Sequence, residues 1–175
     1  MTYKFTNRAR DVIETANDLA ISLGHNYVGT EHLLYGLAKE EGCLASRALE
    51  KQGINSKKVL EKIAELIGEG DKNIMSVIGL TPRTKRIIEN AFKEAKKQNS
   101  EFIGTEHLLI GIIKEADCVA MKIMLDLNVD FEKMYNDIFN VLNKLEVDKN
   151  NNEKNKNTKE QTLNQFGVDL TRNCI

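Results

Sequence analysis

The chain has 175 residues, of which 41% are hydrophobic and 29% charged, so it carries enough apolar side chain to bury a globular core. Its formal net charge is −1, and no global electrostatic bias therefore indicates a nucleic acid or an acidic partner. The opening residues lack the apolar stretch of a secretory signal, and no apolar run approaches the roughly 20 residues that a membrane span needs. We therefore expect a cytoplasmic protein that binds neither nucleic acid nor membrane.

The first part of the chain alternates helix signals with stop signals. Thr6 is the expected N-cap of a first helix, whose apolar residues fall on one helical face. Thr30 is the expected N-cap of a second helix, and Glu31 follows in its first turn, where the helix dipole favours an acid. Glycines flank a third helix and separate it from a fourth. The four expected helices cover residues 8–23, 30–39, 43–51 and 56–67.

The second part of the chain repeats this four-helix plan after a connector at residues 68–73. Thr81 is the expected N-cap of its first helix, and Pro82 at the first helical position is a strong start signal. Thr105 is the expected cap of the next helix, and Asp130 that of the last. The expected helices cover residues 82–98, a stretch that begins at 105, 117–127 and 131–145.

The repetition is visible in the sequence itself. Gly-Thr-Glu-His-Leu-Leu occurs at residues 29–34 and again, unchanged, at residues 104–109, an offset of 75. The same offset relates Phe-Thr-Asn-Arg at residues 5–8 to Leu-Thr-Pro-Arg at residues 80–83. A constant offset with six consecutive identities indicates a tandem duplication. The two repeats cover residues 5–68 and 80–143.

The predicted fold class is all-α, with two pseudo-symmetric four-helix repeats and no strand. Each repeat is small for independent stability, so we expect the two to pack on each other as one domain of residues 1–145. Residues 146–161 are nearly all Asn, Lys and acid, and we expect a disordered linker because they cannot bury enough apolar surface to offset their conformational entropy. Apolar side chains reappear in residues 162–175, which indicates a segment that docks against something this chain lacks.

Catalytic and metal-binding patterns are absent from the sequence. His32 and His107 each follow a glutamate, but neither belongs to an HExxH motif or has a second ligand at metal spacing. No Walker-type glycine loop and no GxGxxG occurs. We therefore predict no enzyme activity, no metal and no cofactor, and a helix-stabilising role for the histidines. An enzyme that uses the Glu-His pairs is the least favoured interpretation.

Three cysteines, Cys43, Cys118 and Cys174, lie far apart and form no CxxC pair. An odd count at wide spacing is typical of reduced thiols in a cytosol rather than of a disulfide framework. Cys43 and Cys118 fall at matched apolar helix positions, where core packing is favoured over a role as nucleophile.

Glu31 and Glu106 are the first candidates for a binding site. Each can be explained as a favourable acid in the first turn of a helix. However, the duplication retains the glutamate together with its five neighbours, although Asp, Ser or Gln would also serve at this position. This retention makes both glutamates candidate ligand-binding residues.

The starts of the two long helices are the second candidates. Thr6 with Arg8 matches Thr81 with Arg83. A helix N-terminus presents unpaired N–H groups that suit an anion, whereas a basic side chain in the first turn opposes the helix dipole. Arginines retained there twice indicate an anionic partner, and an ordinary solvated charged face is the alternative. If these helix starts lie near the two glutamates, each repeat would offer one positive and one negative subsite.

These motifs resemble the N-terminal domain of Clp-family AAA+ unfoldases, and the ClpC type in particular. The resemblance rests on the doubled six-residue motif, the two helix openings and the 75-residue repeat, and it covers residues 3–145. Residues 162–171 also resemble the segment that leads into the family's first ATPase module. The resemblance implies an all-helical domain that docks substrates and adaptor proteins for a hexameric ATP-driven unfoldase, which feeds the Clp protease. We expect this regulatory domain, without the ATPase module, to be a monomer; a free-standing scaffold or decoy for adaptors is the alternative.

In ClpC-type members this domain also recognises phosphoarginine, a degradation mark, at two pseudo-equivalent sites. In this chain, the resemblance implies that the two glutamates pair with the guanidinium group, and that the threonines and arginines at the helix starts surround the phosphate. Asn7 stands where Pro82 stands in the second repeat, so the two sites are expected to differ in strength. The implied ligand-binding residues are Glu31, Glu106, Thr6, Thr81, Arg8 and Arg83.

Overall fold

The computed structural model describes residues 3–71, 73 and 79–143. The predicted linker at residues 146–161, the predicted docking segment at 162–175 with its cysteine, and the expected end of the last helix lie outside the described residues. Met1–Tyr135 make up one compact unit, and both candidate sites lie within it.

The described residues are mainly helical, which confirms the predicted all-α class and the four-helix repeats. The first repeat contains α1 (Asn7–Ser22), α2 (Thr30–Lys39), α3 (Leu44–Lys51) and α4 (Ser56–Leu66). The second repeat contains α5 (Pro82–Lys97), α6 (Thr105–Lys114) and α7 (Val119–Asp126), and residues 131–143 are also helical.

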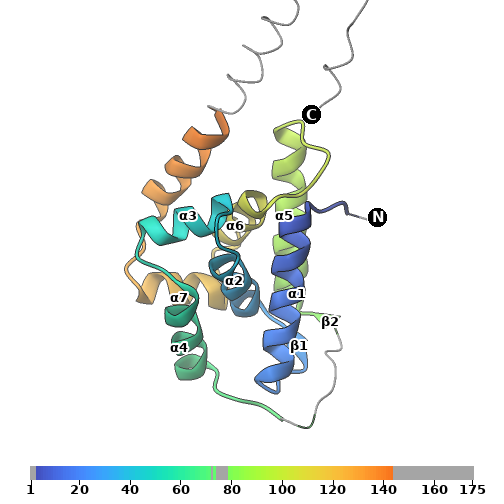
Figure 1. Ribbon diagram of the computed structural model, residues 1–175, viewed down its shortest axis with the longest axis vertical. Coiled ribbons are helices and arrows are strands. Elements are labelled where there is room, and N and C mark those ends of the chain that lie inside the picture. Colours follow the sequence, from blue (N-terminus) through green and yellow to red (C-terminus); the bar gives the residue numbers. More distant parts are fainter. Residues whose placement is uncertain (1–2, 72, 74–78, 144–175) are drawn as a thin grey trace, which may run out of the picture. The chain divides into compact units, whose positions relative to one another are not determined.

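The two helices that carry the repeated motif occupy the centre of the compact unit. α2 contacts α1, α3, α4, α5, α6 and α7, and α6 contacts helices of both repeats. In Figure 1, α2 and α6 lie between the long helices α1 and α5 on one side and α3, α4 and α7 on the other. The motif leucines Leu33, Leu34, Leu108 and Leu109 are at most 1% exposed. The repeats therefore share one core, as predicted.

Matched glycines allow the long helices to approach the central ones. A Cβ atom on Gly36 of α2 would lie 2.5 Å from the carbonyl oxygen of Val12 in α1. A Cβ atom on Gly111 of α6 would lie 2.5 Å from the carbonyl oxygen of Ile87 in α5. Both pairs keep the 75-residue offset, so the duplication preserved a backbone contact that only glycine permits.

Two short parallel pairings cross between the repeats, where the sequence predicted no strand. β1 (Tyr27–Val28) pairs with β2 (Gly79–Leu80) in the register Tyr27 to Gly79 and Val28 to Leu80. A single bridge joins Phe5 to Ile103, which is the same pairing with the repeats exchanged. Periodicity could not predict strands of two residues. They connect the opening of each repeat to the residues before the motif of the other.

The helix starts are only partly as predicted. Thr6 and Thr81 are N-caps, since their Oγ1 atoms accept hydrogen bonds from Ala9 N (3.1 Å) and Thr84 N (3.2 Å). The caps predicted at the two motif threonines are wrong, because α2 and α6 begin after the glycines that precede those threonines.

Thr30 instead serves another helix. Its hydroxyl oxygen accepts a hydrogen bond from Ala120 N (3.1 Å), in the first turn of α7. Thr30 is therefore a contact between the repeats, which its position in the sequence does not reveal.

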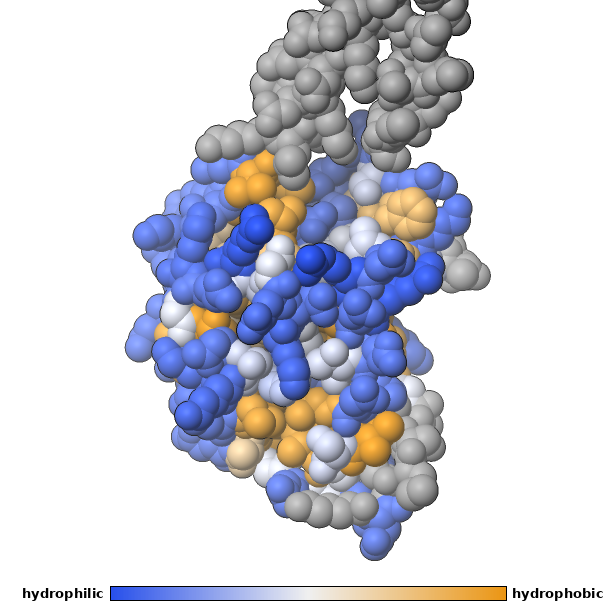
Figure 2. Space-filling view, in the orientation of Figure 1, coloured by the Kyte–Doolittle hydropathy of each residue, from blue (hydrophilic) through white to orange (hydrophobic). Residues whose placement is uncertain are grey.

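The surface shown in Figure 2 is largely hydrophilic, with separate hydrophobic patches. Among the exposed large apolar side chains, Tyr27 and Phe102 stand at matched positions, each just before the buried residue that enters a short pairing. Within the described part of the chain, no helix is both long enough and apolar enough to cross a bilayer.

Candidate functional site

Both candidate glutamates fold back over the start of their own helix. A Cβ atom built on the N-cap residue Gly29 would clash with the carboxylate of Glu31, and one built on Gly104 would clash with that of Glu106. The carboxylates therefore occupy the space that a side chain at the N-cap would fill. This explains why the motif begins with glycine, and it places a negative charge at the positive end of each helix dipole.

The two carboxylates are partly removed from water. The side chain of Glu31 is 10% exposed and that of Glu106 is 18% exposed. Burial raises the pKa of Glu31 above its ordinary value, although its own backbone N–H, His25 and the Thr30 hydroxyl oppose this shift. A carboxylate in such a place interacts more strongly with a cation than one in bulk water does.

The motif histidines hold the helix starts. The backbone N–H of Gly29 donates to His32 Nδ1 (2.8 Å), and that of Gly104 donates to His107 Nδ1 (2.9 Å). Burial lowers the pKa of His32 to about 4, so it is neutral and can accept this bond. Its Nδ1 lies 3.6 Å from Glu31 Oε1, but a neutral ring makes no ion pair there. The predicted helix-stabilising role of the histidines is thereby confirmed.

The residue before each repeated motif is hydrogen-bonded to the start of the long helix from the other repeat. The carbonyl of Val28, next to Gly29, accepts hydrogen bonds from Thr81 N (3.0 Å) and Thr84 Oγ1 (3.0 Å) at the start of α5. Each repeat thus contributes its glutamate to one candidate site and its helix start to the other, a combination that the sequence did not specify. We call the combination of Glu31, Gly29 and Thr81 the Glu31 site.

The second site repeats this arrangement with the repeats exchanged. The carbonyl of Ile103, next to Gly104, accepts a hydrogen bond from Thr6 N (3.0 Å) at the start of α1. We call the combination of Glu106, Gly104 and Thr6 the Glu106 site. Each site thus joins a carboxylate from one repeat to a helix N-terminus from the other.

The two helix starts differ in the N–H groups they offer. In α1 the cap oxygen is bonded to Ala9 N, which leaves the first-turn N–H groups of Asn7 and Arg8. In α5 the corresponding position is Pro82, which has no N–H, so Arg83 alone supplies a donor there. The Glu106 site, which α1 completes, therefore has one more donor for an anion.

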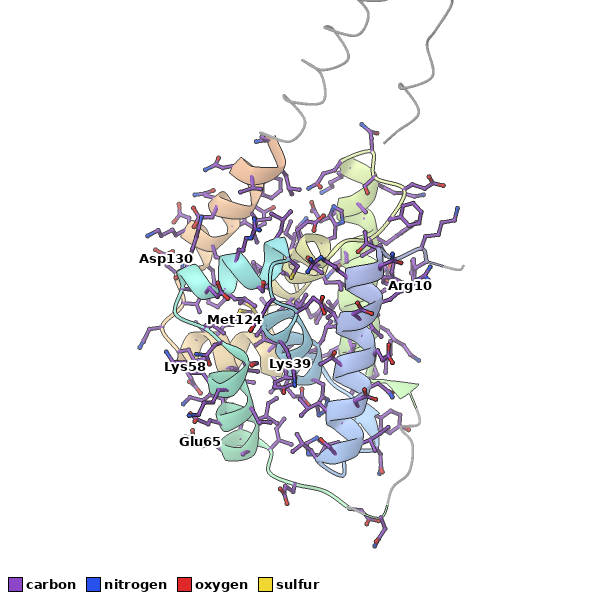
Figure 3. All side chains as sticks on the ribbon, viewed as in Figure 1. Arg10, Lys39, Lys58, Glu65, Met124 and Asp130 are labelled. Carbon is purple, nitrogen blue, oxygen red and sulfur yellow. The ribbon has the colours of Figure 1, made fainter. Side chains whose placement is uncertain are left out.

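The candidate arginines are paired with acids other than the two candidate glutamates. Arg8 Nη1 lies 3.5 Å from Glu40 Oε1 and donates to the Glu41 carbonyl (2.9 Å). Glu40 follows the last residue of α2, about 13 Å along that helix from Glu31 at 1.5 Å per residue. Arg10, labelled in Figure 3, lies near the start of α1 and is also exposed.

Arg83 makes the corresponding contacts in the second repeat. Its guanidinium nitrogens lie 3.3 Å from Glu115 Oε1 and 3.2 Å from Asp117 Oδ2, and Glu115 also pairs with Arg86. The Arg83 side chain is 46% exposed and that of Asp117 is fully accessible, whereas the Glu115 side chain is only 9% exposed. If Arg83 turned to an anion, Glu115 would keep Arg86 as its partner.

Three residues of the sites were not among the sequence candidates: Thr84, His25 and Gln98. Thr84 bonds the Val28 carbonyl, while His25 and Gln98 contact the far side of the two motif histidines. None has a counterpart of the same type 75 residues away, so the repeat gave no signal for them. No group of three or more His, Cys, Asp or Glu in the described part of the chain is arranged to hold a metal ion.

The fold is a duplicated, all-helical domain, and each candidate site combines residues of both repeats. The chain belongs to the Clp repeat N-terminal domain family, whose model matches residues 4–127 and 79–165. It is 36% identical over 168 residues to the negative regulator of genetic competence ClpC/MecB of Bacillus subtilis (strain 168), covering 96% of this chain and 21% of that protein. It is 38% identical over 168 residues to the ATP-dependent Clp protease ATP-binding subunit ClpC of Staphylococcus saprophyticus, covering 96% of this chain and 20% of that protein.

The chain thus spans about a fifth of the length of these curated relatives. Among solved structures, the N-terminal domain of the chaperone ClpD from Arabidopsis thaliana matches with a TM-score of 0.67 and 26% identity, covering 79% of this chain and 97% of that one. The N-domain of ClpV from Vibrio cholerae matches with a TM-score of 0.65 and 16% identity, covering 80% and 86% respectively, and supports the fold alone.

Proposed function

We propose that this chain is a docking domain that receives phosphoarginine-marked proteins at the Glu31 and Glu106 sites. In this proposal it also binds adaptor proteins and acts in the cytoplasm, as the regulatory part of a ClpC-like ATP-dependent unfoldase that works with the Clp protease. The names of the curated relatives, an ATP-binding subunit of the Clp protease among them, support the second part.

The observation that carries the proposal is the crossed pairing of a carboxylate with a helix start. Phosphoarginine joins a guanidinium group directly to a phosphoryl group, so its receptor needs an acid and an anion site a few ångströms apart. Glu31 would provide the acid and the start of α5 the anion site, since Thr81 N bonds the carbonyl of Val28, three residues before Glu31. The guanidinium would donate to the carboxylate, and the phosphoryl oxygens would accept from first-turn N–H groups.

In this proposal the arginines bind the phosphoryl group in addition to the backbone N–H groups. Arg8 and Arg83 stand in the first turns of the helices that would hold the phosphoryl groups. Their exposed side chains would leave Glu40 and Glu115 and turn to the phosphoryl oxygens, where bidentate pairing is stronger.

Calorimetric titration with free phosphoarginine tests the proposal. We expect two sites per chain of unreduced affinity, one in Glu31→Ala or Glu106→Ala, and none in the double variant. A charge-assisted contact contributes roughly 1.5–3 kcal/mol, so each loss should weaken its site at least about tenfold. Glu61→Ala, an exposed acid on α4, is the matched control and should bind as the unmodified chain does. Unchanged affinity in a double variant with intact helical circular dichroism would refute the proposal.

A further inference from the structure

One peptide group connects the two parts of each site. The peptide between Val28 and Gly29 has its carbonyl bonded to the start of α5 and its N–H bonded to His32 Nδ1. The spacing between the carboxylate of Glu31 and the anion-binding end of α5 therefore depends on how His32 is held. The peptide between residues 103 and 104 is bonded in the same way by Thr6 and His107.

The two histidines are held by different partners. His32 Nε2 lies 2.7 Å from His25 Nδ1, and His25 Nε2 lies 2.8 Å from the carbonyl oxygen of Gly68. Because Nδ1 of His32 accepts from Gly29, its Nε2 carries the proton and donates to His25. His25 Nε2 in turn donates to Gly68. This relay from the N-cap to the connector requires both rings to be neutral.

The Glu106 site has an amide in place of the second ring. His107 Nε2 donates to Gln98 Oε1 (2.8 Å), at the C-terminal end of α5. This orientation of the amide leaves Gln98 Nε2 without a partner among the described residues. An amide has no charge change in the physiological range, whereas an imidazole is the side chain that titrates between about pH 5 and 8.

We infer that His25 is a positioning residue for the Glu31 site, and that protonation of His25 weakens cation binding there while the Glu106 site is unaffected. The inference rests on the proposed function of the two sites. His25 would thus make ligand binding at the Glu31 site, but not at the otherwise similar Glu106 site, sensitive to pH.

Two consequences of protonation act in the same direction. A proton on Nδ1 of His25 would face the proton on Nε2 of His32, so the bond that holds His32 would be lost. The buried His32 cannot release its own proton to restore it, since its Nδ1 is already an acceptor. In addition, a positive charge beside Glu31 would compete with the bound guanidinium.

The charged and titratable surroundings of His25 come from two elements. His32 and Glu31 face it from α2, and the carbonyl of Gly68 faces it from the connector. A Cβ atom on Gly70 would lie 3.4 Å from His25 Cδ2, and the acids flanking Gly70 in the chain are Glu69 and Asp71. His25 is itself partly exposed, so protons can reach it from solvent.

The experiment compares the two sites in single-site variants of the full chain. Glu106→Ala leaves the Glu31 site, and Glu31→Ala leaves the Glu106 site as the matched control. Phosphoarginine binding is titrated by calorimetry at about pH 7.5 and about pH 6, the range in which imidazole changes charge. Ionisation of the ligand affects both sites equally. The ratio of the two affinities at each pH therefore reports only pH effects that arise in the protein. We expect the Glu31 site to weaken about fivefold more than the Glu106 site, which is the net contribution of about one hydrogen bond.

Substitutions of His25 then test its role in the Glu106→Ala background. His25→Ala should weaken binding at about pH 7.5 by about fivefold, because His32 loses its acceptor. His25→Gln should restore most of this affinity, as Gln98 serves His107, and should bring the pH dependence down to that of the Glu106 site.

Equal pH dependence at the two sites would overturn the inference, and so would an undiminished difference in His25→Gln. If His25→Gln does not fold, nitrogen NMR of the unmodified chain decides, with a proton on Nε2 of His32 and none on Nδ1 as the expected state. The opposite tautomer would overturn the relay. A chain that binds no phosphoarginine at about pH 7.5 would instead refute the proposed function.

Discussion

Replacing Gly29 by alanine should disable the Glu31 site although every candidate residue is still present. The added Cβ would occupy the space that the Glu31 carboxylate fills over the start of α2. The carboxylate is the far end of a flexible side chain, so it can rotate outwards and the fold need not move. The substitution therefore keeps the Glu31 carboxylate but moves it, and so tests whether binding depends on where the carboxylate lies.

The expected losses of stability and of binding differ in size. Glycine is a better N-cap than alanine, and the exchange costs roughly 1 kcal/mol of the free energy of unfolding. In a chain of this length that corresponds to a fall in melting temperature of about 2–4 °C. The displaced carboxylate loses a contact of roughly 1.5–3 kcal/mol, so the affinity of this site should fall about 10-fold to 150-fold.

The assay is calorimetric titration of phosphoarginine in the Glu106→Ala background, where the Glu31 site alone binds. Gly79→Ala is the matched control, because a Cβ atom there meets nothing within 4 Å although Gly79 lies two residues before Thr81. The control should keep its affinity and melting temperature. Affinity retained in Gly29→Ala would show that the carboxylate need not lie over the helix start, and would refute this account of the site.

Three further predictions concern the helix starts, the core and the histidines. Asn7→Pro in the Glu31→Ala background should weaken phosphoarginine binding about fivefold, because it removes one N–H donor at a position where proline fits a helix; unchanged calorimetric affinity would contradict this. Gly36→Ala should lower the free energy of unfolding by about 2 kcal/mol in denaturant titrations, since overpacking against the Val12 carbonyl exceeds the gain in helix propensity, and a stabilised variant would contradict the close approach of α1 to α2. Burial lowers the pKa of His32 to about 4, so between about pH 6.5 and 4 the unfolded chain binds more protons than the folded one and acidification destabilises the fold. Over this range the free energy of unfolding, measured with urea, should fall by about 3 kcal/mol more than in His32→Gln. Parallel pH profiles of the two proteins would contradict a neutral buried ring.

The helices and the duplication follow from local patterns, which is why the sequence predicted them. Apolar residues at helical spacing and the caps Thr6, Thr81 and Asp130 act within one helix, and the structure has each of these caps. The candidate glutamates were found because the duplication retained them. The predicted caps at Thr30 and Thr105 failed, since a glycine N-cap with a histidine acceptor cannot be told from a threonine N-cap by propensity alone.

Local patterns in the sequence are enough to predict an all-helical, twice-repeated chain with one acid and one basic helix start in each repeat. How these parts combine depends on contacts between residues that are distant in the chain. A glutamate could pair with the helix start of its own repeat or with that of the other repeat. Both arrangements are consistent with the 75-residue offset, because both preserve the symmetry between the repeats. The backbone bonds of Thr81 to Val28 and of Thr6 to Ile103 select the shared arrangement, and they join residues that no local pattern relates. For the same reason the two sites differ through His25 and Gln98, which the repeat does not match but the fold brings to the same position.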